Sequence, residues 1–332
     1  MSYIDTEKVS LHLREKAIDP TNRKILITNF HHTDQETDLT EPANCKGFGR
    51  VRHFKLDSGS GWPLNPLPIV PAARVLGIPQ GSEMRAQVFQ NSVCNWRCWY
   101  CFVDFKLLSG NKTHSEYLSC DELLDLYLDQ DEPPSIIDLS GGQPDLTPEW
   151  VPWMIEALQA RGLDDKTYLW SDDNLSNDYF WRYLSPAQID TIQRYGKYAR
   201  VCCFKGIDPP SFSENTNADP ALFTNQFELV RRLKELKIDL YFYITLTSNT
   251  TTDFSSVIPA FMDRAQKIHE NLPLRIVPLQ IFPFTPVKPR MNATTEDLLK
   301  GQSMAIEVWE NELQRRFKTS LREKSIADID IY

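Results

Sequence analysis

The sequence predicts an α/β protein built on a parallel β-sheet. Two observations, both from residue 86 onward, support this prediction. Short apolar runs alternate with amphipathic segments of helical periodicity, which is the pattern of parallel strands joined by crossover helices. Glycine-rich, polar or cysteine-containing segments follow the apolar runs, and ligand-binding groups collect at the carboxyl ends of parallel strands. The number of strands by itself does not separate a barrel from a doubly wound sheet.

Six strands are expected, and helical segments connect them. The strands are predicted at residues 87–90, 136–140, 167–170, 200–204, 240–247 and 275–282. Pro278 has no backbone N–H, which marks the last strand as an edge or irregular strand. The clearest helix start is Ser119, which forms a capping box with Glu122. Other helices are predicted at 147–162, 183–189, 223–233, 259–268 and 295–317.

Composition limits the class of protein. With 41% hydrophobic and 24% charged residues the chain resembles an ordinary globular protein. Its net charge of −9 argues against a nucleic-acid partner, because affinity for a phosphate backbone is mostly cationic. No apolar run reaches the ~20 residues of a membrane helix, and residues 1–5 lack the apolar core of a secretory signal, so a cytoplasmic protein without a membrane partner is expected.

The main functional signal is a group of cysteines after the first strand, at Cys94, Cys98 and Cys101. A closed zinc site and a ferredoxin cluster each need four protein ligands. Three thiolates can hold a [4Fe–4S] cluster and leave one iron open to another ligand. Half of a zinc ribbon and plain buried thiols are the alternatives, although the chain has no second Cys-x2-Cys pair. The odd total of seven cysteines favours metal binding in a reducing compartment.

The Cys-x3-Cys-x2-Cys spacing, with the aromatic Tyr100 before the third cysteine, resembles the signature of the radical S-adenosylmethionine (radical SAM) superfamily. The resemblance covers about residues 86–290 and implies a partial (β/α)6, TIM-like barrel. It also implies that the open iron binds the methionine moiety of SAM, and that an electron then releases a 5′-deoxyadenosyl radical, which abstracts hydrogen from a substrate. An external electron donor such as flavodoxin or ferredoxin is implied as well.

This resemblance suggests three parts of the chain. Residues 1–85 are expected to form an irregular extension that wraps or caps the barrel, residues 86–290 the barrel, and residues 291–332 a helical extension that packs against the sheet edge. Five prolines between residues 59 and 79 exclude a continuous helix or central strand there. That segment is therefore expected to be an extended wrap over a barrel end and a possible substrate lid.

A glycine-rich turn follows the second predicted strand, at Gly141, Gly142, Gln143 and Pro144. It resembles the Gly-Gly-Glu-Pro motif of the family, which holds the amino group of SAM. Paired glycines let backbone groups approach a ligand closely. The neutral amide of Gln143 replaces an acid, and an amide accepts a hydrogen bond from an ammonium more weakly than a carboxylate does. A simple strand-to-helix turn is the alternative interpretation.

Further cofactor contacts are implied at the ends of later strands. Ser171, Asp172 and Asp173 stand where family members place polar residues against the methionine or ribose of SAM, although such residues also cap helices. Lys205 resembles a lysine that approaches the SAM carboxylate in the activating-enzyme branch, and a surface lysine is the alternative. Tyr100 occupies the position that approaches the adenine. The usual adenine-binding pattern on the fifth strand is not recognisable.

Strand periodicity predicts which side chains face the barrel lumen. If Lys205 points inward, Cys203 does too and Cys202 faces the helices. Cys203 is then a candidate hydrogen-atom donor or substrate contact, or else a small core residue. On the fifth strand, Tyr243 lies on the polar side with Tyr241, Thr245 and Thr247, which is expected to line the lumen and to contact the adenosine or the substrate.

The functional hypothesis is a radical SAM enzyme with one [4Fe–4S] cluster, SAM as cofactor and a small-molecule substrate. A glycyl-radical activating enzyme is the alternative, suggested by Lys205 and the single cluster. The alternative outside enzymes is an interaction protein that binds zinc or a cluster. Such a protein binds metal without cleaving SAM.

Overall fold

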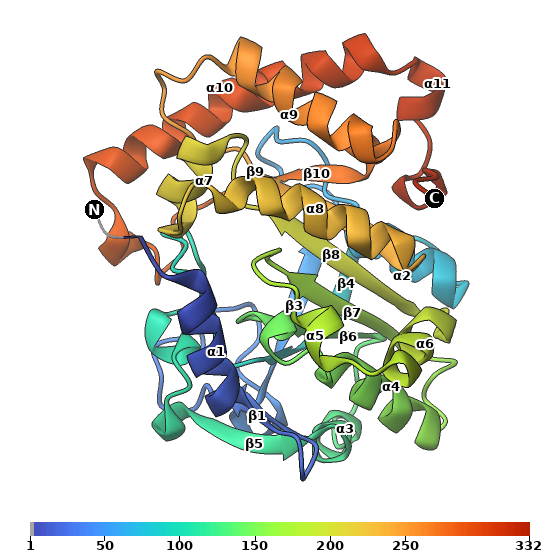
Figure 1. Ribbon diagram of the computed structural model, residues 1–332. Coiled ribbons are helices and arrows are strands. Elements are labelled where there is room, and N and C mark those ends of the chain that lie inside the picture. The colour runs from blue at the N-terminus through green and yellow to red at the C-terminus, as the bar shows by residue number, and fades with distance from the viewer. Residues whose placement is uncertain (1–2) are drawn as a thin grey trace.

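A computed structural model describes residues 3–332, and its centre is a mixed seven-stranded sheet of order β10-β9-β8-β7-β6-β4-β3 (Figure 1). The strands are β3 Gly49–Lys55, β4 Glu83–Gln90, β6 Ile136–Ser140, β7 Tyr168–Asp173, β8 Tyr198–Phe204, β9 Asp239–Thr245 and β10 Ile276–Leu279. All neighbouring pairs are parallel except β3 with β4. Pro278 lies in the edge strand β10, as its missing N–H predicts.

The strand order separates two fold classes that the sequence left open. From β4 to β10 each new parallel strand is added on the same side of the sheet. Because crossovers between parallel strands are right-handed, strands added in one direction put their helices on one face. A doubly wound sheet reverses direction and carries helices on both faces. The chain is therefore a singly wound, partial barrel, and the predicted fold class is confirmed.

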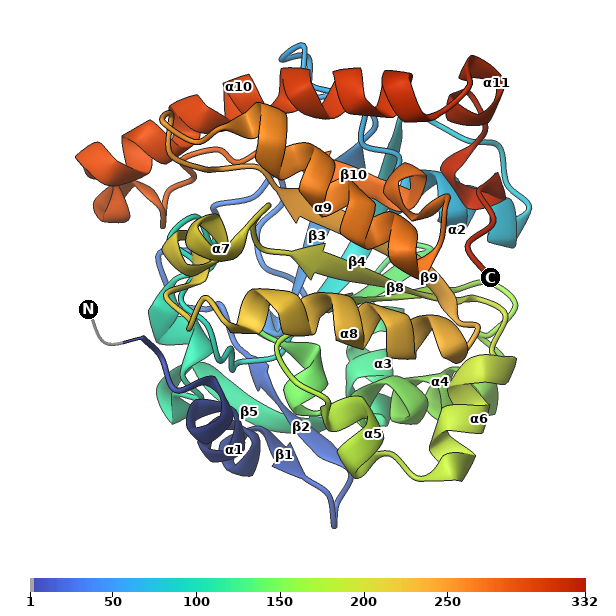
Figure 2. The same ribbon diagram turned by 45° about the horizontal axis from the view of Figure 1, so that its top comes forward.

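One layer of helices covers the outer face of the sheet (Figure 2). These helices are α3 Cys120–Leu128, α4 Trp150–Ala160, α5 Tyr179–Tyr183, α6 Pro186–Arg194, α7 Pro209–Thr216, α8 Leu222–Glu235 and α9 Phe254–Ile268. The capping box of Ser119 and Glu122 starts α3 as predicted. Phe204 of β8, Phe227 of α8 and Phe261 of α9 pack together between the sheet and the helices, with ring centroids 5.0 to 5.2 Å apart.

The opposite face of the sheet carries a separate core, and helix α2 (Ile69–Leu76) closes it. Leu67 and Ile69 pack there with Ile136 and Tyr168, the first residues of β6 and β7. This segment lies at the amino ends of the strands, so the expected lid over a substrate is wrong: residues 67–76 form the floor of the half-barrel. Pro71 does not prevent the helix because it lies in the first turn, where backbone N–H groups have no helical partner.

The amino-terminal residues are part of the same fold. Helix α1 (Thr6–Ala17) leads into a small antiparallel sheet of β1 Ile18–Asp19, β2 Lys24–Thr28 and β5 Ser115–Ser119. Sequence reasoning predicted neither this sheet nor β3. The expected boundary at residue 85 falls inside β4, and β3 pairs with β4 along its whole length.

Helix α10 (Ala293–Arg316) lies across α9, and α11 (Thr319–Arg322) follows it. The start of α10 also reaches the sheet edge as expected, because Gln302 hydrogen-bonds both backbone groups of Ile281 and Leu298 packs near Leu279 of β10. The Trp309 ring packs on Phe261 at a centroid distance of 6.0 Å. Gly301 lets α10 approach the loop after β9, because a Cβ there would lie 1.7 Å from the Ser248 carbonyl oxygen. None of the helices within residues 3–332 has the length and hydropathy needed to cross a membrane.

Gly301→Ala tests this close approach. Alanine favours a helix more than glycine does, so the substitution would be stabilising at an exposed position. Here the added methyl group must displace backbone, and we expect a loss of about 1–3 kcal/mol in the free energy of unfolding, measured by urea denaturation. Ser303→Ala, at an exposed position of the same helix, is the control and should be nearly neutral. Equal stability of both variants would contradict the packing described.

Candidate active site at the mouth of the half-barrel

The cysteine loop leaves the carboxyl end of β4 and is held by backbone hydrogen bonds. The Cys94 N–H donates to the Leu108 carbonyl (3.0 Å), and the Cys101 N–H donates to the Cys98 carbonyl (3.0 Å). The Trp99 N–H donates to the Asn215 carbonyl (3.2 Å) at the end of α7. The loop is thus tied to the protein on both sides of its second cysteine.

The aromatic residues between the cysteines anchor the loop. Trp96 is 1% exposed, lies edge-on to Phe212 at 5.2 Å and donates its indole N–H to Thr6 Oγ1 (3.1 Å). The Trp99 indole N–H donates to Asn215 Oδ1 (3.0 Å). Both indoles bury large apolar surfaces with their single polar group satisfied, which is the arrangement that stabilises buried tryptophan.

The three thiols of the loop share one partly buried environment. Burial raises the pKa of Cys98 to about 12, with the Lys205 charge opposing the increase and the facing Cys94 thiol adding to it. Burial, followed by the Cys94 thiol, also raises the pKa of Cys101. Within residues 3–332, no three His, Cys, Asp or Glu side chains converge closely enough to hold one metal ion. A [4Fe–4S] cluster takes each thiolate on a separate iron, so its ligands need not converge on one point.

The glycine-rich turn packs directly against the segment before Cys94. A Cβ on Gly142 would lie 2.1 Å from the Val93 carbonyl oxygen and 2.4 Å from that of Asn91. The Gln143 N–H donates to the same Val93 carbonyl (2.8 Å). Gly141 has a φ of +90°, where glycine is favoured. Close packing of the turn on the cysteine loop therefore requires these glycines, whether or not a ligand is bound.

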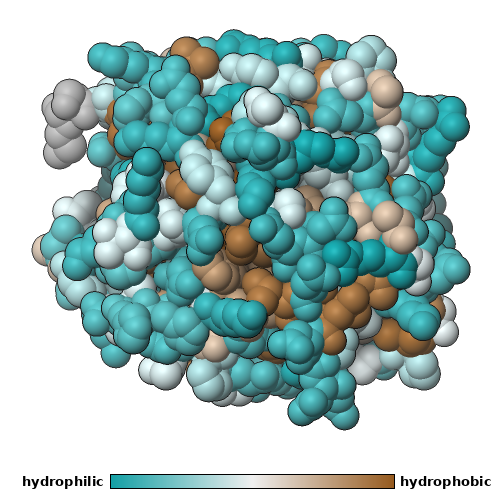
Figure 3. Space-filling model, turned by 90° about the horizontal axis from the view of Figure 1, so that it is seen from below, coloured by the Kyte–Doolittle hydropathy of each residue, from teal (hydrophilic) through white to brown (hydrophobic). Residues whose placement is uncertain are grey.

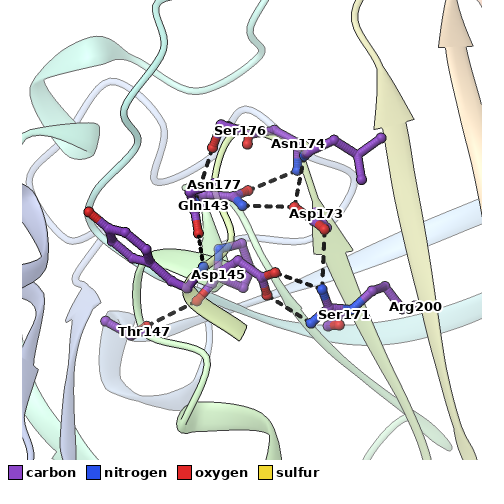
Figure 4. Close-up of polar contacts among 12 residues, drawn as sticks. Gln143, Asp145, Thr147, Ser171, Asp173, Asn174, Ser176, Asn177 and Arg200 are labelled. Atoms are coloured by element: carbon purple, nitrogen blue, oxygen red, sulfur yellow. Dashed lines mark hydrogen bonds and ion pairs between the residues drawn. The ribbon is translucent and has the colours of Figure 1, made fainter. Parts of the chain in front are cut away.

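The side chain of Gln143 is used inside the protein (Figure 4). It is 1% exposed, its Nε2 donates to Asp173 Oδ1 (2.9 Å), and its Oε1 accepts from the Asn174 N–H (2.9 Å). Pro144 begins a short, buried 3-10 turn. The predicted contact of Gln143 with SAM stays a prediction, but the structure gives a reason for the amide: it donates to Asp173, whereas a glutamate carboxylate would repel that acid.

A buried guanidinium holds this region together. Arg200, in β8 and 0% exposed, donates through Nη1 to Asp145 Oδ2 (2.7 Å) and Asp173 Oδ2 (3.1 Å), and through Nη2 to Asp145 Oδ1 (2.8 Å). Burial raises the pKa of Asp145 to about 7 against the opposing charge of Arg200. Sequence reasoning missed this cluster, although an arginine inside an apolar strand is a signal for buried acidic partners.

Strand alternation separates the polar residues of β7. Ser171 and Asp173 face the helices, where the Ser171 hydroxyl lies 2.8 Å from the Tyr198 hydroxyl and Asp173 joins Arg200. Asp172 points the other way, into the lumen, and accepts a hydrogen bond from the Ser140 hydroxyl. The predicted contacts of these three residues with SAM are untested. Only Asp172 lies on the lumen side.

Cys202 and Cys203 face opposite sides of the sheet, as periodicity predicts. Cys202 belongs to the core beneath the helices, and Cys203 packs against the lumen core. Lys205 lies near Cys203, Tyr100 and Cys98. Burial by itself lowers the pKa of Lys205, but these groups raise it well above its usual range, so the ammonium stays charged.

The polar side of β9 faces the lumen, also as predicted. Tyr241 and Tyr243 belong to the lumen core, and the alternating Phe242 belongs to the core beneath the helices. The Tyr243 hydroxyl donates to Asn65 Oδ1 (3.2 Å). The Tyr100 hydroxyl lies 3.0 Å from Thr245 Oγ1, which holds the tyrosine of the cysteine motif against β9. The roles of Tyr100, Tyr243 and Cys203 toward a cofactor or substrate stay predictions.

A cavity of about 280 Å³ opens beside the glycine-rich turn. Its lining comes from β3, from the carboxyl ends of β4 and β6, and from three loops: Asp38, Leu39, Thr40, Arg50, Val51, Arg52, His53, Val88, Phe102, Ser140, Gly141, Phe284 and Thr285. Residues 38–40 belong to the amino-terminal part of the chain, so this part contributes a wall of the cavity. Sequence reasoning missed β3, and with it Arg50 and Arg52.

Comparison with known proteins adds little. No protein-family model and no curated protein matches the chain. Streptococcus suis SuiB bound to the precursor peptide SuiA is 13% identical, with a TM-score of 0.46, over 69% of this chain and 46% of that one. SuiB bound to S-adenosylmethionine is 14% identical, with a TM-score of 0.38, over 53% of this chain and 36% of that one. Native anSMEcpe with bound AdoMet and Kp18Cys peptide is 15% identical, with a TM-score of 0.40, over 57% of this chain and 49% of that one. The chain spans less than half of each structure, and likenesses this weak carry no part of the functional case.

Figure 3 views the molecule from below and shows an apolar stretch bordered by polar side chains.

Gln143→Glu tests the buried network. The new carboxylate would face Asp173 Oδ1, remove one of its two donors and leave two acids in contact, so we expect a loss of about 3 kcal/mol in the free energy of unfolding, measured by urea denaturation. Gln159→Glu, the same change at an exposed position of α4, is the control and should be nearly neutral. The double variant Q143E/D173N restores one acid and one amide and should recover part of the loss. Wild-type stability of Q143E would contradict the network described.

Proposed function

We propose that this chain is a radical SAM enzyme that acts on a small-molecule substrate. The observation that carries the proposal is that three neighbouring thiols, a lysine and a glycine-rich turn lie together at the carboxyl end of the first parallel strand. Ligands collect at this end of parallel barrels. The motif spacing that resembles the radical SAM signature supports the same interpretation.

The donor set fits a [4Fe–4S] cluster. Cys94, Cys98 and Cys101 are the residues that would hold it, and thiolates are the ligands such clusters take. When bound and reduced, the cluster supplies the electron that cleaves SAM to methionine and a 5′-deoxyadenosyl radical. Metal binding must displace the thiol protons, because the thiolate is the ligand.

The residues of the chain orient SAM and shield the site. The Lys205 ammonium is the group that would pair with the SAM carboxylate, since it lies near Cys98 and Tyr100 of the cysteine loop. Arg290 donates to the carbonyls of Cys101 (2.7 Å) and Val103 (2.9 Å), which closes the end of the cysteine loop. Tyr100, held by Thr245, forms the wall between the loop and β9.

The cavity favours a small molecule over a protein substrate. At about 280 Å³ it lies near the lower end of ligand-binding pockets. It opens between Gly141 and residues of β3, next to the turn that the motif assigns to SAM. A glycyl-radical activating enzyme would instead bind a partner protein, and a glycine-centred radical signal on that partner would favour this alternative.

Anaerobic reconstitution with iron and sulfide, followed by dithionite and SAM, tests the proposal. We expect the chain to form 5′-deoxyadenosine, detected by chromatography, and the single variants C94A, C98A and C101A to form none. Cys45→Ala is the matched control because Cys45 is buried outside the loop. An iron- or zinc-loaded protein that leaves SAM intact would refute the enzyme and support an interaction protein.

Lys205→Met tests the assignment of the SAM carboxylate. Loss of one partly buried charge pair is expected to raise the KM for SAM about tenfold, with a smaller change in kcat. The variant should keep its cluster, which its absorption spectrum reports. Lys267→Met, at an exposed position of α9, is the control. An unchanged KM for SAM in Lys205→Met would show that another group binds the carboxylate.

A further inference from the structure

One carboxyl group inside the half-barrel has no partner in the protein. Asp138 lies in the middle of β6 and is 1% exposed, and neither of its carboxylate oxygens has a hydrogen-bond partner within residues 3–332. Its alternate neighbours on the strand, Ile136 and Ser140, face the lumen core and the cavity, so the Asp138 side chain faces the lumen as well. Burial, with the charge of Asp172 adding to it, raises the pKa of Asp138 well above its usual range.

A guanidinium without a partner lines the adjoining cavity. Arg52 of β3 lies over the rings of Phe54 (4.3 Å) and Phe102 (5.6 Å). In the described part of the chain no ion pair or hydrogen bond engages it, whereas its neighbour Arg50 pairs with Asp38 at 3.1 Å. Arg52 is therefore available to bind an anion.

Arg52 and Asp138 flank the same short stretch of β4. Arg52 lies opposite Ala86, and Asp138 lies opposite Val88 on the other side of the strand. Both β4 residues face the lumen and are two positions apart. The charge of Arg52 also acts on the Asp138 carboxyl and lowers its pKa, although burial outweighs this effect. An anion site and a donor-binding site therefore lie side by side.

Asp138 weakens the fold as it stands. A buried carboxyl group without a partner costs free energy, and the buried acid Asp145 on the other face of the sheet is paired, with Arg200. Val88, opposite Asp138, and Ser140, its neighbour on the same face of β6, line the cavity, and a buried acid beside a cavity is a functional-site candidate. Lys205 lies near the cysteine loop and is assigned above to SAM, and Asp172 already accepts a hydrogen bond from the Ser140 hydroxyl, which leaves Arg52 and Asp138 for a second ligand.

We propose that Arg52 and Asp138 recognise a zwitterionic small molecule, an α-amino acid with an apolar side chain. The Arg52 guanidinium binds the carboxylate through paired N–H donors, and Asp138 accepts from the ammonium and becomes ionised when the cation arrives. Leu39, Val88, Phe102 and Phe284 supply the apolar wall for the side chain. The inference rests on the proposed function and names the substrate class of that enzyme.

Three matched compounds test the recognition of both charges. They are L-phenylalanine, L-phenylalaninamide, which lacks the carboxylate, and N-acetyl-L-phenylalanine, which lacks the ammonium. Isothermal titration calorimetry with the full chain should show that L-phenylalanine binds about tenfold tighter than either derivative. Arg52→Gln should lose the preference for L-phenylalanine over L-phenylalaninamide but keep the preference over N-acetyl-L-phenylalanine. Asp138→Asn should lose the preference over N-acetyl-L-phenylalanine but keep the preference over L-phenylalaninamide.

Thermal unfolding separates recognition from a structural role. The folded state holds the Asp138 proton above pH 4, where the unfolded chain loses it, so wild-type stability falls as pH rises toward the raised pKa. Asp138→Asn removes this loss, and its Tm should exceed that of the wild type by a margin that widens with pH. The charged groups that face Asp138, Asp172 on β7 and Arg52 on β3, are the same in both proteins. Asp131→Asn, at an exposed turn, is the control.

Several outcomes would overturn the inference: no binding of any of the three compounds, selectivity unchanged in both variants, or a lower Tm for Asp138→Asn, which a structural role predicts. Binding is measured with and without cluster and SAM. Intact amino-acid binding without SAM cleavage then refutes the proposed function alone, and SAM cleavage without amino-acid binding refutes this inference alone.

Discussion

The buried ion cluster of Arg200 is the interaction on which the candidate site depends. It joins the turn after β6 to the end of β7 from the middle of β8, through Asp145 and Asp173. Breaking a buried pair by removing one partner costs about 3–5 kcal/mol, because it leaves an uncompensated charge. Asp173 in turn accepts a hydrogen bond from the Gln143 side chain, and the Gln143 N–H donates to the Val93 carbonyl, just before Cys94. The ion pairs of Arg200 on the helix side of the sheet therefore help to fix the position of the cysteine loop.

The same cluster explains how this chain differs from the motif that it resembles. An acid at position 143 would meet Asp173, whereas an amide supplies the donor that Asp173 requires. The two glycines before Gln143 serve both packing and access to the cavity. Gly142 is needed for packing against Val93, and the backbone that packs there also borders the cavity at Gly141. Packing and ligand access are therefore properties of one short turn.

The two faces of the sheet differ in how their charged side chains are paired. On the helix side, Arg200 donates to both carboxylate oxygens of Asp145 and to one of Asp173, and all three side chains are buried. On the lumen side, Arg52, Lys205 and Asp138 make no ion pair within residues 3–332, although Arg52 lies near Asp138. Groups left unpaired in a buried space lower stability, and proteins accept that cost at functional sites. The unpaired charges therefore favour the lumen as the place where ligands bind.

Local patterns in the sequence determined the α/β class, the parallel strands, the capping box at Ser119 and the opposite orientations of Cys202 and Cys203, because each depends on residues close in the chain. They could not decide the strand order, the floor formed by α2, or the pairing of β3 with β4. These features, and with them the cavity and the meeting of Arg52 with Asp138, depend on contacts between segments far apart in the chain. Only the folded chain decides them, since such contacts are chosen by the burial and pairing of the whole sheet and leave no local periodicity.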